Sequence, residues 1–345
     1  MTDHSPHSHS IEPLPDGMLV DSFGRRIVNL RISVTDRCNF RCRYCMPEDG
    51  MQWLPREALL SYEELARVAA VFVDLGVRKI RLTGGEPLMR HDLSRLVGYL
   101  SSISRLEDLA LTTNGFFLAD QIGELVNAGL RRINVSLDSL DPVKFNLMTR
   151  RNYYQRVLDG LVAAEAHGLL PLKINAVLIR GINDDEIVKF AELARSKPYV
   201  IRFIEFMPIG ADDGWSPERV VPAAEVISRI ERGVGKKLLP IEIHGAQPAD
   251  RFQFEDGKGE IGFISSVSEP FCSHCNRVRI TSDGKLRTCL FSLAETDLRE
   301  PLRNHASDEE LRLIIRNAVW KKEAGHSINK PEFERPKRSM SQIGG

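Results

Sequence analysis

Six short runs rich in valine, isoleucine and leucine alternate with segments of helical period between residues 30 and 206. This alternation restricts the fold more than any other feature of the sequence, because it is typical of parallel strands joined by right-handed helical crossovers. The sequence therefore predicts an α/β fold with six strands, at 30–35, 78–83, 109–113, 132–137, 172–179 and 200–206.

The segment between the first two predicted strands carries the clearest helix signal. Ser61 and Glu64 have the spacing of a capping box, apolar residues repeat on one face from residue 65 to residue 73, and Gly76 supplies a stop. Weaker helical patterns follow the later strands, at 93–103, 122–128, 157–166 and 187–194.

Polar and glycine-rich residues follow three of the predicted strands, at 83–86, 112–115 and 136–138. The carboxyl ends of parallel strands are where binding sites form, both in barrels and in open α/β sheets. Six strands are too few for a complete eight-stranded barrel. The pattern alone leaves an incomplete barrel and a doubly wound open sheet as alternatives.

The character of the sequence changes after residue 206, where turns become frequent and strand-like runs become short. We expect an α/β unit at 21–210 and a smaller α+β extension at 211–333. We also expect flexible ends, a leader at 1–20 and a tail at 334–345 that finishes with Gly344 and Gly345. The leader is rich in histidine, and a disordered segment is preferred there to a metal-binding tract.

The charge balance excludes several classes of partner. Lysine plus arginine equals aspartate plus glutamate at 47 each, so the chain lacks the overall field that attracts nucleic acid or an anionic membrane. No uncharged apolar stretch reaches the roughly 18 residues of a membrane span, and the first residues lack the apolar run of a signal peptide. We expect a cytoplasmic protein with no nucleic acid and no membrane partner.

Six cysteines form two groups of three. In a large chain without an export signal, such groups favour metal or redox chemistry over disulfides. The first group follows the first strand directly, so its thiols lie in one loop at the carboxyl end of the sheet. Three thiolates leave a metal position vacant for a cofactor, and a zinc site with a distant fourth ligand or a ferredoxin-like cluster are the alternatives. The first triad is Cys38, Cys42 and Cys45, and the second is Cys272, Cys275 and Cys289.

Tyr44 lies within the first loop, and Gly84-Gly85-Glu86-Pro87 ends the second strand. With these residues the chain resembles the radical S-adenosylmethionine superfamily. The resemblance implies that Cys38, Cys42 and Cys45 hold three irons of a 4Fe-4S cluster, while S-adenosylmethionine binds the fourth and is cleaved to a 5′-deoxyadenosyl radical on reduction. It also implies that the cofactor contacts Tyr44, Gly85, Ser136 and Met207.

Spacing alone does not decide what the second triad holds. The spacing fits a zinc site completed by a histidine such as His274 or His244 as well as it fits a second iron-sulfur cluster. Arg277 and Arg279 lie between these cysteines, two residues apart, and therefore share a face if the segment is extended.

Basic residues recur on the first two strands, where Lys79 and Arg81 repeat the spacing and Arg31 precedes the first triad. Each pair alone is typical of a solvated strand face. Together they favour a polyanion, because arginine binds phosphate in a bidentate manner. Three such bonds of roughly 1.5 to 3 kcal/mol each would cover about the 8 kcal/mol of micromolar binding, which makes a nucleoside triphosphate a reasonable ligand.

Several separated motifs agree on a narrower resemblance. Residues 81–87, the second triad with its enclosed Asn-Arg-Val-Arg, and the terminal Gly-Gly are together similar to the GTP 3′,8-cyclase family of molybdenum cofactor biosynthesis. The resemblance implies an incomplete six-stranded (βα) TIM-like barrel with a C-terminal α+β extension, and a second 4Fe-4S cluster that binds guanine. Carried over by position, the residues that contact GTP would be Arg31, Arg81, Thr112, Lys173, Arg277, Val278 and Arg279.

The reaction implied by this resemblance is that of a radical lyase. Hydrogen is removed from ribose C3′, the C3′ radical attacks guanine C8, and reduction gives (8S)-3′,8-cyclo-7,8-dihydroguanosine 5′-triphosphate, the first step of molybdopterin synthesis. The resemblance further implies an external one-electron reductant and transfer of the product to the cyclic pyranopterin monophosphate synthase. A homodimer is a separate expectation, since the sequence does not report the oligomeric state. The Gly344-Gly345 tail would reach the active site, whereas its composition alone indicates a frayed end.

Two other functions compete with this interpretation. A peptide-modifying maturase would also use radical chemistry, but such enzymes carry more C-terminal cysteines and need no arginines for a triphosphate. A non-catalytic zinc or iron-sulfur protein, with both triads structural, would leave the Gly-Gly-Glu-Pro loop without a purpose.

Overall fold

The structure is a computed structural model that describes residues 18–209, 214–242 and 247–344. The six predicted strands are all present, within two residues of their expected bounds: β1 (Asn29–Ser33), β2 (Lys79–Thr83), β3 (Asp108–Thr113), β4 (Arg132–Ser136), β5 (Leu172–Leu178) and β6 (Tyr199–Glu205). Most of the predicted leader, and the predicted boundary at 210, lie outside the described residues. Within the leader, Leu19 is already buried in the core.

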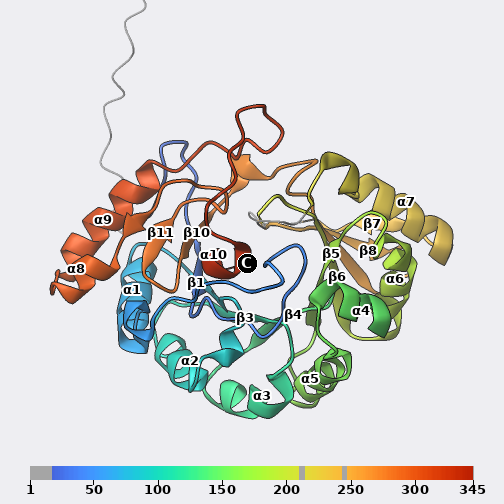
Figure 1. The fold of residues 1–345 in the computed structure, drawn as a ribbon, viewed down its shortest axis with the longest axis horizontal. Helices are drawn as coiled ribbons and strands as arrows, with labels where there is room; N and C mark the ends of the chain where they lie inside the picture. Colours follow the sequence, from blue (N-terminus) through green and yellow to red (C-terminus); the bar gives the residue numbers. More distant parts are fainter. Residues whose placement is uncertain (1–17, 210–213, 243–246, 345) are drawn as a thin grey trace, which may run out of the picture.

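Helices follow these strands and cover their outer side (Figure 1). The predicted capping box is confirmed, since the Ser61 hydroxyl accepts from the Glu64 N–H and the Glu64 carboxylate accepts from the Ser61 N–H. An additional helix that the sequence analysis did not predict, α4, begins after Asp141, whose carboxylate caps it. The helices of this unit are α1 (Tyr62–Asp74), α2 (Leu93–Ser101), α3 (Leu118–Asn127), α4 (Pro142–Thr149), α5 (Tyr154–Ala166) and α6 (Ile187–Ser196).

The C-terminal region lengthens the same sheet at both ends. β9 (Glu260–Ile264) pairs in parallel with β6, and β10 (Arg277–Ile280) pairs in parallel with β1. The strand order is β12-β11-β10-β1-β2-β3-β4-β5-β6-β9-β8-β7, so the two ends of the sheet do not pair with each other. The remaining strands are antiparallel to their neighbours: β7 (Leu238–Pro240), β8 (Asp250–Phe254), β11 (Lys285–Arg287) and β12 (Thr296–Asp297).

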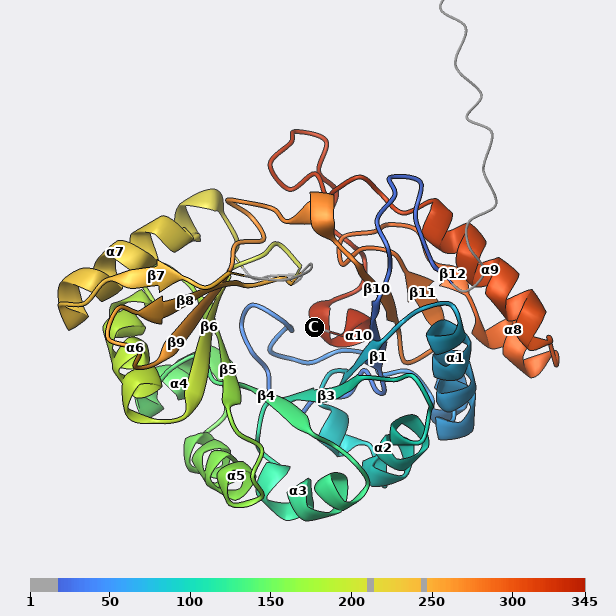
Figure 2. The same cartoon turned by 180° about the vertical axis from the view of Figure 1, so that it is seen from behind.

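The strands curve into an open arc, which Figure 2 shows from behind. This architecture is the predicted partial TIM-like barrel with a C-terminal extension, and it excludes the doubly wound open sheet. The extension also contributes helices to the outer surface, namely α7 (Ala223–Val234), α8 (Arg299–Arg303) and α9 (Asp308–Trp320). Within the described part of the chain, no helix has the length and apolar character needed to cross a membrane.

The last segment of the chain differs from the flexible tail that the sequence predicts at 334–345. It ends in α10 (Met340–Ile343), which lies inside the arc of strands (Figure 1). Ile343 is 1% exposed, because it packs in a small apolar cluster with Ile209, Val220 and Phe291. The expectation of a frayed end was based on polar composition and overlooked this apolar anchor.

Candidate active site

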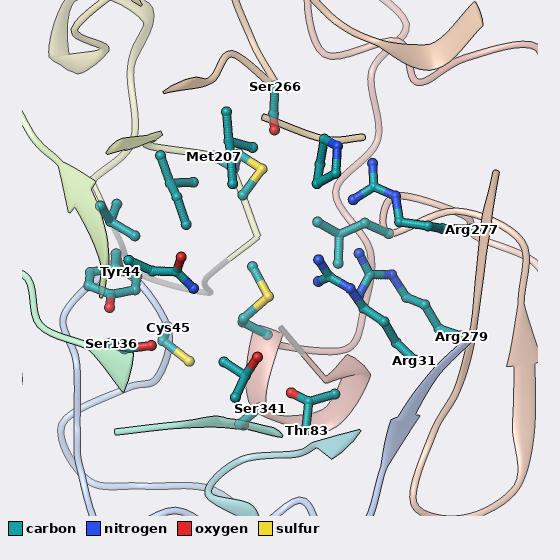
Figure 3. Close-up of a pocket in the computed structure, with 18 of the residues that line it drawn as sticks. Arg31, Tyr44, Cys45, Thr83, Ser136, Met207, Ser266, Arg277, Arg279 and Ser341 are labelled. Carbon is teal, nitrogen blue, oxygen red and sulfur yellow. The ribbon is translucent and has the colours of Figure 1, made fainter. Parts of the chain in front are cut away.

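Both cysteine triads open into one cavity of about 260 Å³ at the carboxyl ends of the strands, which we call the thiol cavity. Figure 3 shows Arg31, Arg277 and Arg279 on one side of it, facing Tyr44, Cys45 and Ser136 on the other. The six cysteines are all free thiols. The two predicted metal centres therefore share one chamber, as a reaction between their ligands requires.

The loop of the first triad follows β1 and is fixed against α4. The Arg41 and Arg43 N–H groups donate to the Thr149 and Met148 carbonyls, each at 3.0 Å. Burial and, to a smaller extent, the charge of the nearby Glu86 raise the pKa of the Cys38 thiol to about 12. Burial likewise raises the pKa of Cys42, and that of Cys45 to about 12. These thiols become thiolates only when a positive charge, such as bound iron, replaces their lost hydration.

The Gly84-Gly85-Glu86 turn at the end of β2 lies directly against this loop. A Cβ on Gly85 would stand 2.4 Å from the Arg37 carbonyl oxygen, so only glycine permits the approach. The Gly85 N–H donates to the Thr35 carbonyl at 2.7 Å, which joins the two strand ends. The turn therefore presents backbone groups to the cavity beside the first triad.

Glu86 is a buried carboxylate that holds neighbouring strand ends in place. It accepts hydrogen bonds from the Thr113 hydroxyl and from the Asn114 N–H, both at 2.7 Å. Burial raises its pKa to about 7. Glu86 thus ties the end of β2 to the end of β3 next to Cys38.

Tyr44 is positioned by a carboxylate that the sequence analysis did not select. Its hydroxyl donates to Asp138 at 2.7 Å, and the other Asp138 oxygen accepts from the Val177 N–H at 2.9 Å. Both residues line the thiol cavity. Burial raises the pKa of Asp138 to about 6. The sequence did signal this residue, because it follows β4 in the polar segment 136–138.

The second triad lies at the opposite wall, around β10. Cys272 begins a short 3-10 helix (η5, Cys272–His274), Cys275 precedes β10, and Cys289 follows β11. Burial opposes ionisation of Cys275, yet Lys322 and Arg277 bring its pKa below the ordinary value. Of the two histidines considered as zinc ligands, His274 is exposed and bonds to Ser273, and His244 lies outside the described residues.

Three arginines lie side by side on neighbouring strands of the sheet, on β10, β1 and β2. Arg31 on β1 pairs in register with Arg279 on β10 and with Arg81 on β2. Burial lowers the pKa of Arg31, and the charges of Arg279 and Arg81 lower it further. Burial also lowers the pKa of Arg279 to about 9 and that of Arg81 to about 10. Like charges this close favour an anion between them.

Arg31 and Arg277 also line a second cavity, the basic cavity, which adjoins the first and extends toward the amino ends of the strands. Burial and the neighbouring Arg202 lower the pKa of Lys173 here to about 7. The Nε atom of Arg81 is buried without a hydrogen-bond partner among the described residues. The basic residues of this cavity are Arg31, Lys79, Arg81, Arg132, Lys173, Arg202, Arg251 and Arg277, and its acidic residues are Asp108 and Glu260.

The C-terminal segment reaches this chamber. Met340 and Ser341 line the thiol cavity, and the Gly344 carbonyl accepts from Arg279 at 2.8 Å. Arg338 anchors the segment through Asp283 at 2.8 Å and Glu295 at 2.8 Å. Gly345 lies outside the described residues. The predicted approach of the Gly-Gly pair to the active site can therefore be described only for Gly344.

The structure brings together nearly all residues selected from the sequence. The thiol cavity contains the six cysteines with Arg31, Tyr44, Gly85, Thr112, Ser136, Met207, Arg277 and Arg279, and the basic cavity contains Arg81 and Lys173. Val278 is the exception, because its side chain is fully buried in the apolar core on the other face of β10. Arg132 and Arg202 were missed, although an arginine inside the apolar run 199–206 signals an inward charge.

The residues present fit two iron-sulfur clusters and an anionic substrate. Each triad offers three thiols, and the second has lysine and arginine charges beside it to balance an anionic cluster. The Asn175 Oδ1 atom, in the wall of the thiol cavity, is buried without a protein partner among the described residues. Such an orphaned acceptor is expected where a ligand donates.

Comparison with known families agrees with the two parts of the fold. The radical SAM superfamily profile matches residues 32–194, and the profile for the C-terminal region of molybdenum cofactor synthesis proteins, Molybdenum Cofactor Synthesis C, matches residues 199–328. The first match runs from the end of β1 into α6 and includes the first triad, and the second runs from β6 into the extension and includes the second triad.

Curated relatives are similar over nearly the whole chain. A GTP 3′,8-cyclase of Syntrophomonas wolfei is 47% identical over 328 residues, covering 95% of this chain and 100% of the relative. The Streptomyces coelicolor GTP 3′,8-cyclase is 44% identical, with 95% and 96% covered. The mitochondrial GTP 3′,8-cyclase of Arabidopsis thaliana is 43% identical, with 98% and 87% covered.

Solved structures share the fold at low sequence identity. Streptococcus suis SuiB bound to S-adenosylmethionine superposes with a TM-score of 0.60 at 14% identity, covering 90% of this chain and 76% of that one. The structure described as native anSMEcpe with bound AdoMet gives 0.56 at 12% identity, with 87% and 82% covered. At these identities the likeness concerns the fold alone.

Proposed function

We infer that the chamber cyclises GTP, because the chain belongs to the GTP 3′,8-cyclase family of radical S-adenosylmethionine enzymes, which act in molybdenum cofactor biosynthesis. The product is (8S)-3′,8-cyclo-7,8-dihydroguanosine 5′-triphosphate. The observation that carries the proposal is geometric. Both triads line one cavity, and that cavity adjoins a second one rich in buried arginine and lysine. A peptide maturase would have no use for the second cavity.

The side of the chamber around Cys38, Cys42 and Cys45 binds the first 4Fe-4S cluster and S-adenosylmethionine. When bound, this pair supplies the carbon radical that removes hydrogen from ribose C3′. The Gly84-Gly85 backbone lies where it can meet the methionyl group, and Tyr44, Ser136 and Met207 face the same space (Figure 3). The Tyr44 hydroxyl is committed to Asp138, which fixes the orientation of the ring.

The opposite side binds GTP. Cys272, Cys275 and Cys289 would hold the second cluster, which would supply an iron for the guanine, and Thr112 lines the same cavity. Arg31, Arg277 and Arg279 hold the phosphates nearest the thiol cavity, and Arg81 and Lys173 hold those deeper in the basic cavity. A triphosphate relieves the repulsion among these cations, and each charge-assisted bond contributes about 1.5 to 3 kcal/mol. Val278 contributes only through its backbone.

The reaction needs partners outside this chain. An external one-electron reductant supplies electrons, and the product passes to the cyclic pyranopterin monophosphate synthase, because the cyclised nucleotide is an intermediate of that pathway. Six free thiols in two oxygen-sensitive sites support a reducing, cytoplasmic location. The homodimer stays a prediction.

The test is a single anaerobic turnover of the reconstituted protein with dithionite, S-adenosylmethionine and GTP deuterated at C3′. We expect 5′-deoxyadenosine carrying deuterium, together with a new nucleotide that has lost its C3′ deuterium, both detected by mass spectrometry. GTP deuterated at C8 is the matched control, and its label should stay in the nucleotide. Unlabelled 5′-deoxyadenosine in the first arm would contradict the assigned hydrogen abstraction.

A further inference from the structure

A buried lysine outside both cavities lies behind the second triad. Lys322 follows α9 and is 3% exposed. Its ammonium group donates to the Thr288 carbonyl and, at 3.2 Å, to the Arg277 carbonyl. Thr288 immediately precedes Cys289, and Arg277 follows Cys275 by two residues. Lys322 therefore joins the two segments that carry these cysteines.

Within the described ranges, no aspartate or glutamate forms an ion pair with Lys322, whose hydrogen bonds go to two backbone carbonyls. The neighbouring Glu323 instead accepts from the Thr288 hydroxyl at 2.7 Å. A buried ammonium group without an anionic partner is costly, and two neutral carbonyls compensate only part of its lost hydration. The arrangement therefore implies an anion close by that is not a carboxylate.

The segment that carries Lys322 is held firmly against the triad. Arg25 donates to the carbonyls of Cys272 at 2.7 Å and of Ala324 at 2.8 Å, and its Nε atom bonds Asp21 at 2.6 Å. A Cβ on Gly325 would lie 3.1 Å from the Cβ of Cys272. Because this backbone is fixed on both sides, the ammonium group has a defined place relative to the thiols.

We propose that Lys322 is a positioning residue that supplies the fixed positive charge of the second iron-sulfur cluster and raises the reduction potential of that cluster. The cluster with its thiolates is the missing anion, and reduction adds a further negative charge to it. A nearby cation stabilises the reduced form more than the oxidised form. The hydrogen bonds from Lys322 to the Thr288 and Arg277 carbonyls also fix the backbone beside Cys289 and Cys275, and so orient these two thiols.

The position of Lys322 agrees with this role, because its ammonium group contacts the backbone of the two segments that carry Cys275 and Cys289. Lys322 lines neither cavity. Its influence on substrate is therefore exerted through the cluster.

The experiment measures the midpoint potential of the second cluster by redox titration followed by electron paramagnetic resonance. The full-length chain is used with Cys38, Cys42 and Cys45 all changed to serine, so that only the second cluster contributes. In that background, Lys322→Met is compared with Lys322→Arg. The matched control is Lys321→Met, because Lys321 is the adjacent lysine and is exposed.

We expect Lys322→Met to shift the potential to a more negative value, Lys322→Arg to keep most of the original potential, and Lys321→Met to change nothing. Equal potentials in Lys322→Met and Lys321→Met, at equal iron content, would overturn the proposal. If Lys322→Met loses iron, retention of the cluster in Lys322→Arg supports the charge role, and equal loss in both overturns it.

The proposal rests on a cluster being present at the second triad, and iron analysis separates the two questions. Absence of iron from the parent chain with serine at the first triad would contradict the proposed function itself. Iron present in the parent, with a potential that does not respond to Lys322, would contradict only the role of this lysine.

Discussion

The two cysteine triads carry the same number of thiols, yet their surroundings have opposite charge. Buried carboxylates, Glu86 and Asp138, lie near the first triad and raise the pKa of its thiols in addition to burial. Lysine and arginine lie near the second and oppose the effect of burial. A negative environment favours the oxidised form of a cluster and makes the reduced form a stronger donor, which suits cleavage of a sulfonium. A positive environment suits retention of an anionic nucleotide.

The largest expected effect comes from removing one ligand on either side. Cys38→Ser should reduce 5′-deoxyadenosine formation below detection, since the cofactor loses its cluster. Iron should fall from roughly eight to roughly four per chain. Cys289→Ser should lose a similar amount of iron but keep some cleavage of S-adenosylmethionine while forming no cyclised nucleotide. Equal loss of S-adenosylmethionine cleavage in both variants would contradict the assignment of cofactor cleavage to the first triad and nucleotide binding to the second.

A smaller effect is expected from Arg277, one of the two arginines that line both cavities. Arg277→Ala should weaken GTP binding by about 10- to 100-fold, the equivalent of one charge-assisted bond, and leave S-adenosylmethionine binding unchanged. Anaerobic calorimetry with each ligand measures both. Arg195→Ala is the control, because Arg195 pairs with Asp256 and lies outside both cavities. A weakened affinity for S-adenosylmethionine in Arg277→Ala would contradict the assignment of Arg277 to the GTP side of the chamber.

The smallest effect should appear as a pH dependence of GTP binding. Lys173 has its pKa lowered to about 7, so its ammonium form is present below pH 7 and is lost as the pH rises through that value. GTP binds the ammonium form and raises this pKa. The dissociation constant should therefore increase above pH 7 by up to about tenfold per pH unit. Measured between pH 7.5 and 8.5, Lys173→Met should bind weakly but without this slope. An equal slope in the variant would assign the proton to another group.

The local parts of the fold could be predicted from the sequence, and the long-range parts could not. The six strands and the capping box at Ser61 each depend on residues close together in the chain, and all were found. The pairing of β9 with β6 and of β10 with β1 depends on contacts between distant segments of four to seven residues. Short strands of this kind carry too little pattern to specify their neighbours.

The candidate site divides in the same way. The cysteines and the Gly-Gly-Glu-Pro turn could be selected because their spacing is local. Asp138 and Arg202 have only weak local signals, and the cavities that they line form only when the sheet brings their strands together. Val278 was included with its arginine neighbours although alternation along a strand turns its side chain to the opposite face. Lys322 has no spacing motif at all, since its partners are backbone carbonyls.

The pairing of β1 with β10 has a consequence for how the protein is made. Asn29 bonds Asn276 at 2.8 Å across a separation of 247 residues. Until β10 leaves the ribosome, one edge of β1 has no partner. The chamber then also lacks the wall that carries the second triad. An open strand edge invites pairing with other chains. The chamber, with the second triad in its wall, therefore cannot be complete until β10 has been synthesised, and chains truncated before residue 277 should aggregate more readily than the full chain.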